Sequence, residues 1–544
     1  MPNAGQTPHP RRPSLAAIIT AARAGGLGHA WDLFVAGGYD RSDADPAALA
    51  VKGRLLKDRA LRAAPADRPA AFTLAANAYA AADALEPQPY TRINVATLRL
   101  LGGDPATAAT IARGLLAWLD QGGDMRETPY YLAATRAEAL LLCADAAAAE
   151  AALDQAVAHD PDGWSDRAST LRQLRVILTA QRRETAWLDR FRPPRSLHFA
   201  GHLGVASEGS DALRTEIAAY IDRERIGFGY GALAAGSDIL IAEALLDHDA
   251  ELHVILPTGL PTFIAQSIAP YGEDWGARFD ACLDRATSLR TLTGVTGDYE
   301  PLATRLAADV AMGSALMNAR QLESEAVQLL VADEGEGRYG AGLAIAGDAA
   351  RWTAGGHRQH VLRWARNAPV AASGHRTQPE GRSDRRLLAL LLFAFDGLDH
   401  LDEGAFAHAL DEVLGPFDTA IAGSAAQPDL LLPHGNARIA AFADPDAAWR
   451  YARAILALAP ATLPLRVAGH YALVHQRAAP AVLIGAGIAA LETIAASAMP
   501  GVLSVSDALA SVLFVTGARE TLAETIGEAA GMRLLALSGA PEDQ

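Results

Sequence analysis

Apolar and polar positions alternate along the chain with a period that changes near residue 195. From residue 14 to about residue 190, the apolar positions recur at helical spacing, and Gly, Asp and Pro interrupt them at short intervals. This pattern predicts helices of roughly 12 to 20 residues joined by tight turns. Stacked helical hairpins are the expected arrangement.

The middle of the chain predicts short strands that alternate with helices. Strands are expected at residues 196–200, 226–230, 252–256, 326–333 and 357–364. Helices are expected at 211–223, from 237, around 278–279, at 299–322 and around 352. Because these strands are apolar almost throughout, they predict a Rossmann-like parallel sheet that is covered on both faces.

The last part of the chain predicts a β-α-β-β-α-β order, which is ferredoxin-like. Its strands are expected in the apolar run from 386 and at 429–432, 437–441, 463–474 and 501–504. Its helices are expected at 402–414, 445–458, 484–498 and from 507. The fold class is therefore multidomain, with α, α/β and α+β parts.

Proline and polar stretches mark the expected boundaries between these parts. Pro193 and Pro194 end the helical region, because a double proline cannot continue a helix. We expect disorder at 1–13, a helical-repeat domain at 14–192, a parallel-sheet domain at 195–369, a linker at 370–385 and a third folded domain at 386–540.

Composition and charge argue against several classes of function. The 544 residues carry a formal net charge of −16, which disfavours a nucleic-acid surface, because phosphate contacts need clustered Lys and Arg. The N-terminus lacks the apolar core of a signal peptide, and no apolar run is long enough for a membrane helix. With two cysteines, neither a disulfide framework nor a cysteine-based metal site follows. We expect a cytoplasmic protein that binds neither nucleic acid nor membrane.

Glycines at predicted strand ends mark the candidate ligand site. Parallel sheets bind ligands at the carboxyl ends of their strands, where glycine lets a phosphate approach a helix N-terminus. The candidate ligand-binding residues are Gly201, His202, Gly231, Gly236, Ser237, Asp238, Glu243, Gly347 and Asp348. No catalytic or metal-binding residue is assigned.

Several of these residues have a structural alternative. Asp238, Glu243 and Asp348 could do acid–base work, but Asp238 at a helix start could equally be an N-terminal cap. Glu243 could face either the sheet or solvent. His202 follows a glycine at a strand end and is expected to line the pocket.

The helical part resembles the TRAF-binding-type helical domain of apoptosis signal-regulating kinases and bacterial multidomain proteins. The resemblance rests on residues 53–58, 90–104 and 130–142. Residues 138–161, with their small residues and terminal proline, also resemble a tetratricopeptide-like repeat. These resemblances imply a scaffold that binds a protein partner. Within it, Asn94 and Thr97 are interpreted as buried residues that lock adjacent helices, with ligand binding as the alternative.

The middle part resembles the SLOG superfamily, Rossmann-like domains related to lysine-decarboxylase-like phosphoribohydrolases and the DNA-processing protein DprA. The matching segments are 199–202, 231–246, 251–257 and 274–279. The resemblance implies recognition of a nucleotide-derived ligand. Hydrolytic relatives carry a P-G-G-x-G-T-x-x-E turn, which residues 341–352 lack, so binding without turnover is favoured over cleavage of an N-glycosidic bond.

The last part resembles a class III nucleotidyl cyclase domain, through segments at 393–398, 434–438, 442–448, 463–474, 485–494 and 501–506. Cyclases of this class align the nucleotide with two metal ions held by two carboxylates. Here Phe395 takes the first carboxylate position, with Asp396 one residue out of register, and Asn436 takes the second. The family's Asn and Arg positions fall on Gly487 and Leu491. An inactive cyclase-like domain follows, with a homodimer as a further expectation.

Three hypotheses remain open. The favoured one is a cytoplasmic signalling protein that senses a nucleotide or NAD-derived ligand, binds a partner through its helices and uses a cyclase-like domain without turnover. The second is an enzyme, either a nucleotide N-glycosidic hydrolase or a residual cyclase. The third is a scaffold that neither binds a small molecule nor catalyses. No cofactor is assigned with certainty.

Overall fold

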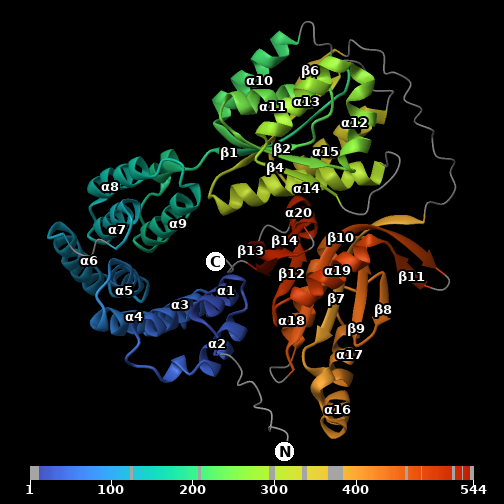
Figure 1. Ribbon diagram of the computed structural model, residues 1–544. Coiled ribbons are helices and arrows are strands. Elements are labelled where there is room, and N and C mark those ends of the chain that lie inside the picture. The colour runs from blue at the N-terminus through green and yellow to red at the C-terminus, as the bar shows by residue number, and fades with distance from the viewer. Residues whose placement is uncertain are drawn as a thin grey trace, which may run out of the picture. The chain divides into compact units, whose positions relative to one another are not determined.

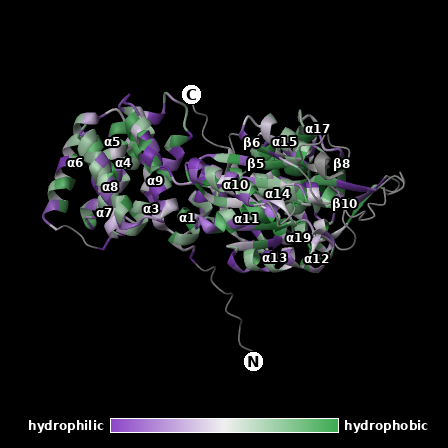
Figure 2. Ribbon diagram, turned by 90° about the horizontal axis from the view of Figure 1, so that it is seen from above, coloured by the Kyte–Doolittle hydropathy of each residue, from purple (hydrophilic) through white to green (hydrophobic). Residues whose placement is uncertain are grey.

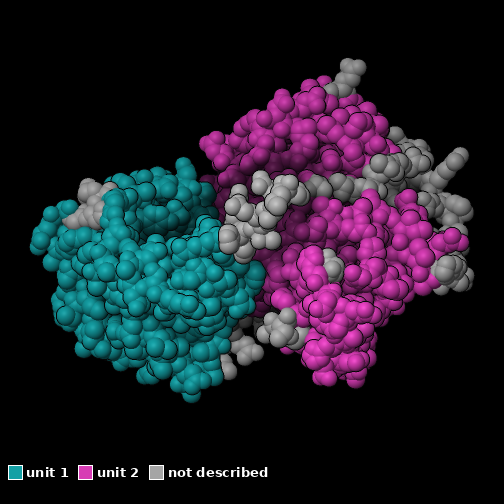
Figure 3. All heavy atoms as spheres, turned by 60° about the horizontal axis from the view of Figure 1, so that its bottom comes forward, with its two compact units in different colours: residues 1–192, 540–544 teal, residues 193–539 magenta. Residues whose placement is uncertain are grey.

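The protein is described by a computed structural model over 12–122, 126–205, 210–292, 301–333, 340–365, 384–459, 463–478, 481–517, 521–529 and 531–539. The chain divides into two compact units, Met1–Arg192 with Ala540–Gln544, and Pro193–Gly539 (Figure 3). Of the residues expected to be disordered, 1–11 lie outside the described residues, and so do residues 370–383 of the expected linker.

Two expected boundaries need correction. Arg12, expected in the disordered stretch 1–13, donates to the Gly37 carbonyl at 2.6 Å. Arg385, expected in the linker 370–385, already begins a strand.

Helices fill the described part of the first unit, as the helical spacing predicts. Several start with an Asp or Thr cap followed by proline, a pairing suited to a helix start. The helices are α1 (Leu15–Arg23), α2 (Leu27–Ala36), η1 (Tyr39–Arg41), α3 (Pro46–Leu61), α4 (Arg68–Leu85), α5 (Pro89–Leu101), α6 (Pro105–Asp120), α7 (Pro129–Leu142), α8 (Ala146–His159), α9 (Trp164–Ala180) and η2 (Ala186–Phe191). From α3 to α8, each helix packs against the next one along the chain.

Buried polar side chains join alternate helices of this unit. Thr97 of α5 donates to the Glu138 carboxylate of α7 at 2.6 Å, and Gln173 of α9 donates to the same oxygen at 3.0 Å. Lys57 of α3 donates to the Asn94 side-chain oxygen of α5 at 3.3 Å. Asn94 therefore connects α5 to α3, and Thr97 connects α5 to α7, which agrees with their interpretation as residues that lock packed helices together.

A six-stranded parallel sheet organises residues 195–365, the parallel-sheet part of the second unit. The sheet is parallel throughout, as the apolar strands predict. Its strands are β1 (Arg195–Gly201), β2 (Ile226–Gly231), β3 (Glu251–Leu256), β4 (Ser288–Thr291), β5 (Ala326–Asp333) and β6 (Arg358–Trp364). Their order is β4-β3-β2-β1-β5-β6, so the direction of strand addition reverses between β1 and β5.

Helices connect these strands. They are α10 (Asp211–Glu224), α11 (Ser237–Asp247), α12 (Leu260–Ser267), η3 (Ala269–Tyr271), α13 (Glu273–Arg285), α14 (Pro301–Gln321) and α15 (Gly340–Ala354). The core lies between the sheet and this layer, around Leu197, Phe199 and Leu252, which are fully buried. Figure 2 draws α11 largely in the hydrophobic colour, in line with its burial.

A mixed sheet organises residues 384–539, the mixed-sheet part of the second unit. Its strands are β7 (Arg385–Phe395), β8 (Leu430–His434), β9 (Ala437–Phe442), β10 (Leu465–Ala478), β11 (Ala481–Ile484), β12 (Leu503–Ser506), β13 (Thr521–Ala529) and β14 (Met532–Gly539). The order is β13-β14-β12-β10-β7-β9-β8, with β11 paired to β10. Its helical segments are η4 (Leu398–His400), α16 (Glu403–Ala409), the π-turn η5 (Leu410–Leu414), α17 (Gly415–Ala422), α18 (Pro445–Leu458), α19 (Ala486–Ser497) and α20 (Asp507–Thr516).

The two sheets of the second unit share one helix between them. Helix α14 packs on β1, β2 and β3 with one side and on α20 with the other, as Figure 1 shows. Because it is covered from both sides, α14 is apolar around most of its circumference.

Four strands and two helices differ from the sequence expectations. Strand β4 is short and carries polar Ser288 and Arg290, so its pattern is too weak to predict it. Strands β13 and β14 form a hairpin, although Ala and Glu in β13 favour helix. Strand β11 and helix α12 were also not predicted. The helix expected at 402–414 continues through a π-turn to Ala422. Pro416 has no backbone N–H for the regular helical hydrogen bond, which favours the irregular turn before it.

Candidate functional site

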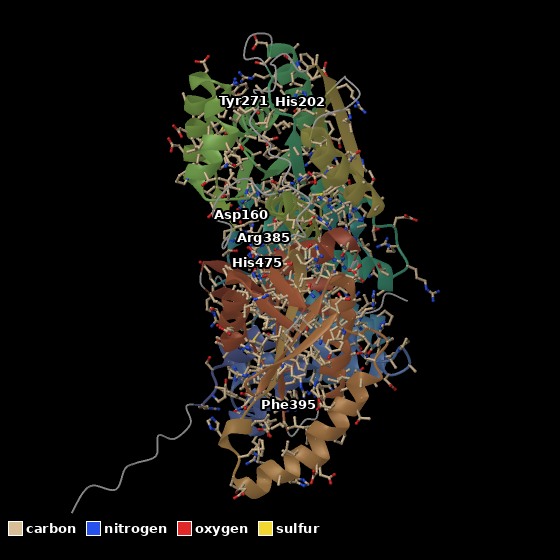
Figure 4. The ribbon with its side chains drawn as sticks, turned by 90° about the vertical axis from the view of Figure 1, so that its right-hand side faces the viewer. Asp160, His202, Tyr271, Arg385, Phe395 and His475 are labelled. Atoms are coloured by element: carbon tan, nitrogen blue, oxygen red, sulfur yellow. The ribbon has the colours of Figure 1, made fainter. Side chains whose placement is uncertain are left out.

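The carboxyl ends of β1 and β5 lie where the strand order reverses. In doubly wound sheets this reversal opens a crevice, and ligands bind there. The end of β1 supplies Gly201 and the next residue is His202, and the start of α11 supplies Ser237 and Asp238. Helix α15 supplies Asp348 from beyond β5. Figure 4 shows His202 within the parallel-sheet part.

The Asp238 carboxylate accepts hydrogen bonds from two backbone segments at this edge. Its Oδ1 accepts the Gly201 N–H at 2.7 Å, and its Oδ2 accepts the Ala234 N–H at 3.2 Å. Both donors precede α11, whose N-cap is Gly236, so the alternative of Asp238 as a helix cap is not what the structure shows. The carboxylate instead ties the end of β1 to the turn after β2.

Burial also changes the acidity of Asp238. The side chain is 6% exposed, and this desolvation raises the pKa of Asp238 to about 7. The two N–H donors oppose the rise, whereas the charge of Asp348 adds to it. The charge of Asp348 therefore reaches Asp238 across the point where β1 and β5 part.

The glycines at this edge permit close packing. A Cβ on Gly201 would lie 2.2 Å from the Ser237 Cβ, and one on Gly231 would lie 2.6 Å from the Phe199 ring. Gly236 has φ +111°, and a Cβ there would lie 3.1 Å from the His202 carbonyl oxygen. Ser237 Oγ donates to that same carbonyl at 3.1 Å. The chain's own 202–205 segment thus occupies the space against Gly236 that the sequence suggested for a phosphate.

His202 links the ends of two strands. It is 1% exposed, and its Nε2 lies 3.0 Å from the carbonyl oxygen of Trp364 at the end of β6. Its Nδ1 lies 3.2 Å from the Leu203 carbonyl oxygen. The ring is buried between these contacts, whereas the sequence led us to expect it on the wall of an open pocket.

Glu243 lies apart from this edge. Its two carboxylate oxygens accept from Nε and Nη2 of Arg278 on α13, at 2.7 and 2.6 Å. The same guanidinium lies 4.3 Å from the Trp275 ring centroid. Glu243 is therefore engaged in packing α11 against α13, and the structure does not bring it together with Asp238.

Asp348 belongs to an ion cluster that includes two residues not predicted from the sequence. Arg351 Nη2 donates to Asp348 Oδ1 at 2.6 Å, and Arg351 Nε lies 2.8 Å from Asp309 Oδ1. Asp309 is 1% exposed on α14. Gly347 leaves room for this arginine, because a Cβ there would lie 3.4 Å from Nη1. The sequence signal that could have pointed to Asp309 is its position as a carboxylate within the otherwise largely apolar α14.

The acidity of Asp348 is shifted like that of Asp238. Burial raises the pKa of Asp348 to about 7, with Arg351 opposing the change and Asp309 adding to it. Burial likewise raises the pKa of Asp309. This region thus holds three buried carboxyl groups, and Arg351 pairs with two of them, Asp309 and Asp348. Asp238 and Asp348 can take up or release a proton near neutral pH, which suits hydrogen bonds to hydroxyl groups or acid–base work.

A buried polar row lies beneath this cluster. Gln328 donates to His198 Nδ1 at 2.9 Å, and Gln359 donates to the Gln328 side-chain oxygen at 2.5 Å. Burial, with a contribution from Arg351, lowers the pKa of His198 to about 3. His198 is therefore a neutral, hydrogen-bonded core residue, and its ring stacks on Trp352 at 5.9 Å between centroids.

The cyclase-like positions in the mixed sheet hold no carboxylate pair. Phe395 is 8% exposed and packs edge-on against Phe417, with centroids 4.9 Å apart. Asp396 accepts from Arg466 Nη2 at 2.9 Å. Figure 4 places Phe395 at the far end of the sheet from Arg385 and His475. Among the described residues, no group of three His, Cys, Asp or Glu could hold a metal ion.

The other positions of the cyclase resemblance are Asn436, Gly487 and Leu491. Asn436 is exposed in the turn between β8 and β9. Gly487 and Leu491 are buried on α19, and a Cβ on Gly487 would lie 2.5 Å from the Ala472 Cβ. A longer side chain at Gly487 would therefore require β10 to move.

Comparison with known proteins assigns no family. No family model matches the chain, and no curated protein matches it. The adenylyl cyclase CyaB from P. aeruginosa is 14% identical, with a TM-score of 0.24 over 29% of this chain and 97% of that chain. An adenylate/guanylate cyclase/hydrolase from Silicibacter pomeroyi is 19% identical, with a TM-score of 0.23 over 29% and 99%.

A third solved structure gives a similar result. The guanylate cyclase domain of RhGC from Catenaria anguillulae, in complex with GTP, is 12% identical, with a TM-score of 0.23 over 29% and 98%. Similarity at this level assigns neither a family nor an activity. Separately, within the described part of the chain, no helix has both the length and the apolar character that crossing a membrane requires.

Proposed function

We propose that the protein is a regulatory protein whose parallel-sheet part binds a nucleotide-derived ligand without turning it over. The observation that carries the proposal is the pair Asp238 and Asp348. They lie on either side of the strand-order reversal, and each has a pKa of about 7. Polar groups at such a reversal form the usual ligand site of a doubly wound sheet.

The chemistry of this edge favours the sugar side of a nucleotide. A protonated carboxyl group donates one hydrogen bond and a carboxylate accepts several, so the pair can match the two hydroxyls of a ribose. A phosphate is less suited to contact the pair, because Arg351 and Arg305 are already paired with Asp348 and Asp309. The 202–205 segment further occupies the space against Gly236. The proposed contact is therefore the ribose of a nucleotide or of an NAD derivative.

The other two parts of the chain have supporting roles in this proposal. The helical unit binds a protein partner, and its cross-helix bonds through Thr97 and Glu138 hold that surface in shape. The mixed-sheet part serves assembly, including a homodimer, without cyclase turnover. Its support is the buried Phe395 and the ion-paired Asp396 at the positions where a cyclase needs metal ligands.

One observation favours an enzyme as the second candidate. Two carboxyl groups with pKa near 7 could act as general acid and general base, which cleavage of an N-glycosidic bond would use. Both oxygens of Asp238 already accept backbone N–H groups, and Asp348 is bound to Arg351. These contacts favour a fixed binding role over proton transfer.

A binding experiment on the full chain separates the candidates. Adenine and guanine nucleotides, cyclic nucleotides and NAD are titrated by calorimetry, and each mixture is then analysed by chromatography. We expect one class to bind unchanged and Asp348→Asn to weaken it at least tenfold. Glu243→Gln is the matched control, because Glu243 lies in the α11–α13 packing. A released base would favour the hydrolase, and cyclic nucleotide formed with manganese would contradict the inactive cyclase.

A further inference from the structure

The helical segment that follows the first strand of the mixed sheet exposes two large apolar side chains. It runs through α16, the π-turn η5 and α17, and Figures 1 and 4 show it projecting from the end of the mixed sheet near Phe395. Phe406 and Leu410 are 40% and 45% exposed. Further along the segment, Phe417 and Ile421 are only 4% and 5% exposed. The large apolar side chains thus divide into an outer pair and an inner pair.

The π-turn separates these two pairs. The four residues recur at the spacing i, i+4, i+11 and i+15, which places all of them on one face of a regular helix. A π-turn takes one extra residue into the helix, and each residue accounts for about 100° of rotation. The turn at Leu410–Leu414 therefore rotates Phe406 and Leu410 away from the face on which Phe417 is buried.

The outer pair lies in an acidic stretch of the chain. Residues 387–437 contain eight Asp and Glu and no Lys or Arg. Glu403 precedes the outer pair by three and seven residues, so its side chain lies on the same helix face. Among the described residues, the exposed carboxylates of Glu403, Asp411 and Glu412 have no ion-pair partner. We define the outer face of the segment as Glu403, Phe406, Leu410, Asp411 and Glu412.

Positive charge near the base of the segment is already neutralised. Arg438 donates through Nη2 to Asp418 Oδ2 at 2.7 Å, and Arg466 donates through Nη2 to Asp396 Oδ2 at 2.9 Å. The outer face therefore keeps its negative charge. A second copy of the same face would be repelled, and so would a membrane surface with anionic lipids. The complementary occupant has apolar side chains on one helix face with Lys or Arg beside them.

We propose that the outer face docks a basic amphipathic helix of a partner protein. Phe406 and Leu410 pack between the apolar side chains of that helix, and the three carboxylates pair with its Lys or Arg side chains. Because two apolar anchors bury little area, the contact belongs to the weak, transient class of interfaces. This partner site is separate from the nucleotide site proposed at Asp238 and Asp348.

Fluorescence anisotropy with the full chain tests the proposal. The probe is a labelled synthetic Leu–Lys peptide of about five helical turns, with Leu on one helix face and Lys on the rest. We expect saturable binding to wild type and about tenfold weaker binding to Phe406→Ser with Leu410→Ser, because two apolar contacts are lost. Leu458→Ser with Ile484→Ser is the matched control, since it removes two similarly exposed apolar side chains elsewhere in the mixed-sheet part.

Two further peptides separate shape from charge. A scrambled Leu–Lys peptide keeps the charge but loses the apolar face, and a Leu–Glu peptide keeps the face but reverses the charge. Both are expected to bind wild type about tenfold more weakly than the first peptide does. Glu403→Gln with Asp411→Asn and Glu412→Gln is expected to weaken binding and to reduce its dependence on salt. If the double serine variant does not fold, this charge-neutral variant carries the same test.

Several results would overturn the proposal. They are equal binding of the Leu–Lys peptide to wild type and to the double serine variant, no binding to wild type, and equal binding of the Leu–Glu peptide. A wild-type dimer that the double serine variant loses would assign the outer face to a second copy instead. Binding to phosphatidylserine vesicles that the same variant loses would assign it to a membrane. Asp348→Asn must bind the peptide as wild type does, so the result is independent of the proposed nucleotide site.

Discussion

Gly313 of α14 packs directly on the backbone of Ser511 of α20. A Cβ on Gly313 would lie 2.1 Å from the Ser511 carbonyl oxygen, so only glycine allows this approach. The contact brings together the helix that covers the parallel sheet and the helix that covers the mixed sheet. It explains why both sheets belong to one compact unit.

Gly313→Ala is therefore expected to destabilise the second unit. The added methyl group forces α14 and α20 apart, and overpacking of this kind costs about 1–3 kcal/mol. Urea unfolding followed by circular dichroism measures the loss. The control is Gly276→Ala in α13, where a Cβ meets nothing within 4 Å. Alanine there should stabilise by about 0.5–1 kcal/mol through helix propensity. Equal effects of the two substitutions would contradict the close helix contact.

Asp348 and Asp238 should make stability depend on pH. Each has a pKa raised from 3.8 to about 7, so the folded protein binds more protons than the unfolded chain between these values. Their contribution is complete below about pH 4 and is lost as the pH rises through about 7. Asp348→Asn removes its share of this dependence. The free energy of unfolding of the variant, minus that of the wild type, should therefore be roughly 1–3 kcal/mol larger at pH 8 than at pH 4.

Urea unfolding at several pH values checks this second prediction. The matched control is Asp444→Asn, an exposed helix cap whose carboxylate lies outside the cluster. Its pH profile should run parallel to that of the wild type. A wild-type stability that rises between pH 5 and pH 8, with Asp348→Asn showing the same rise, would count against buried, proton-binding carboxyl groups.

Restoring the missing carboxylate of the cyclase-like sheet should damage the fold. Phe395→Asp replaces a ring packed against Phe417 with an unpaired charge. We expect a loss of about 3–5 kcal/mol and no cyclase activity, because a cavity and a buried charge are created together. Asp396→Asn affects only a half-exposed ion pair with Arg466, so its cost should stay below about 1 kcal/mol. Chemical denaturation of both variants and a manganese-dependent cyclase assay provide the readout.

The helical unit offers a separate test of its cross-helix bonds. Thr97→Val removes the donor to Glu138 and leaves one fewer partner for a carboxylate whose pKa is already raised by burial. A cost of about 1–3 kcal/mol is expected from the lost bond. Thr110→Val removes an exposed hydroxyl that bonds only within its own helix, and should cost less than about 0.5 kcal/mol. Similar losses in both variants would show that Thr97 does not lock α5 to α7.

The sequence predicted much of the second unit because its signals are local. Apolar strands between helices predicted β1, β2, β3, β5 and β6 within about one residue, and the parallel sheet they form is confirmed. Strands β4, β11 and β13 were missed because short or Ala- and Glu-rich strands are stabilised by their neighbours rather than by their own pattern. Strand β14 lies inside the sheet between β13 and β12, and it was missed although its own residues are largely apolar. The π-turn at Leu410–Leu414 likewise depends on the helix around it.

The candidate site also contains residues that the sequence predicted and residues that it did not. Asp238 was selected because it follows a glycine-bearing strand end, and Asp348 because it stands in the segment compared with the hydrolytic relatives' turn. In the structure Asp238 contacts the end of β1 at Gly201, and Asp348 lies within α15. Asp309 and Arg351 were missed, because their meeting depends on how α14 packs beside α15. Glycine spacing suggested a phosphate cradle at Gly236, yet the same glycine equally permits contact with the 202–205 segment. Sequence spacing alone does not distinguish these two uses of glycine.

The most direct test of the central claim is calorimetric titration of the full chain with nucleotides and NAD, comparing wild type, Asp348→Asn and Glu243→Gln. The account predicts saturable binding of one ribose-containing ligand to wild type and to Glu243→Gln, at least tenfold weaker binding to Asp348→Asn, and recovery of the ligand unchanged. Equal affinity in all three proteins would place the ligand elsewhere, and no binding of any ligand to wild type would contradict the claim.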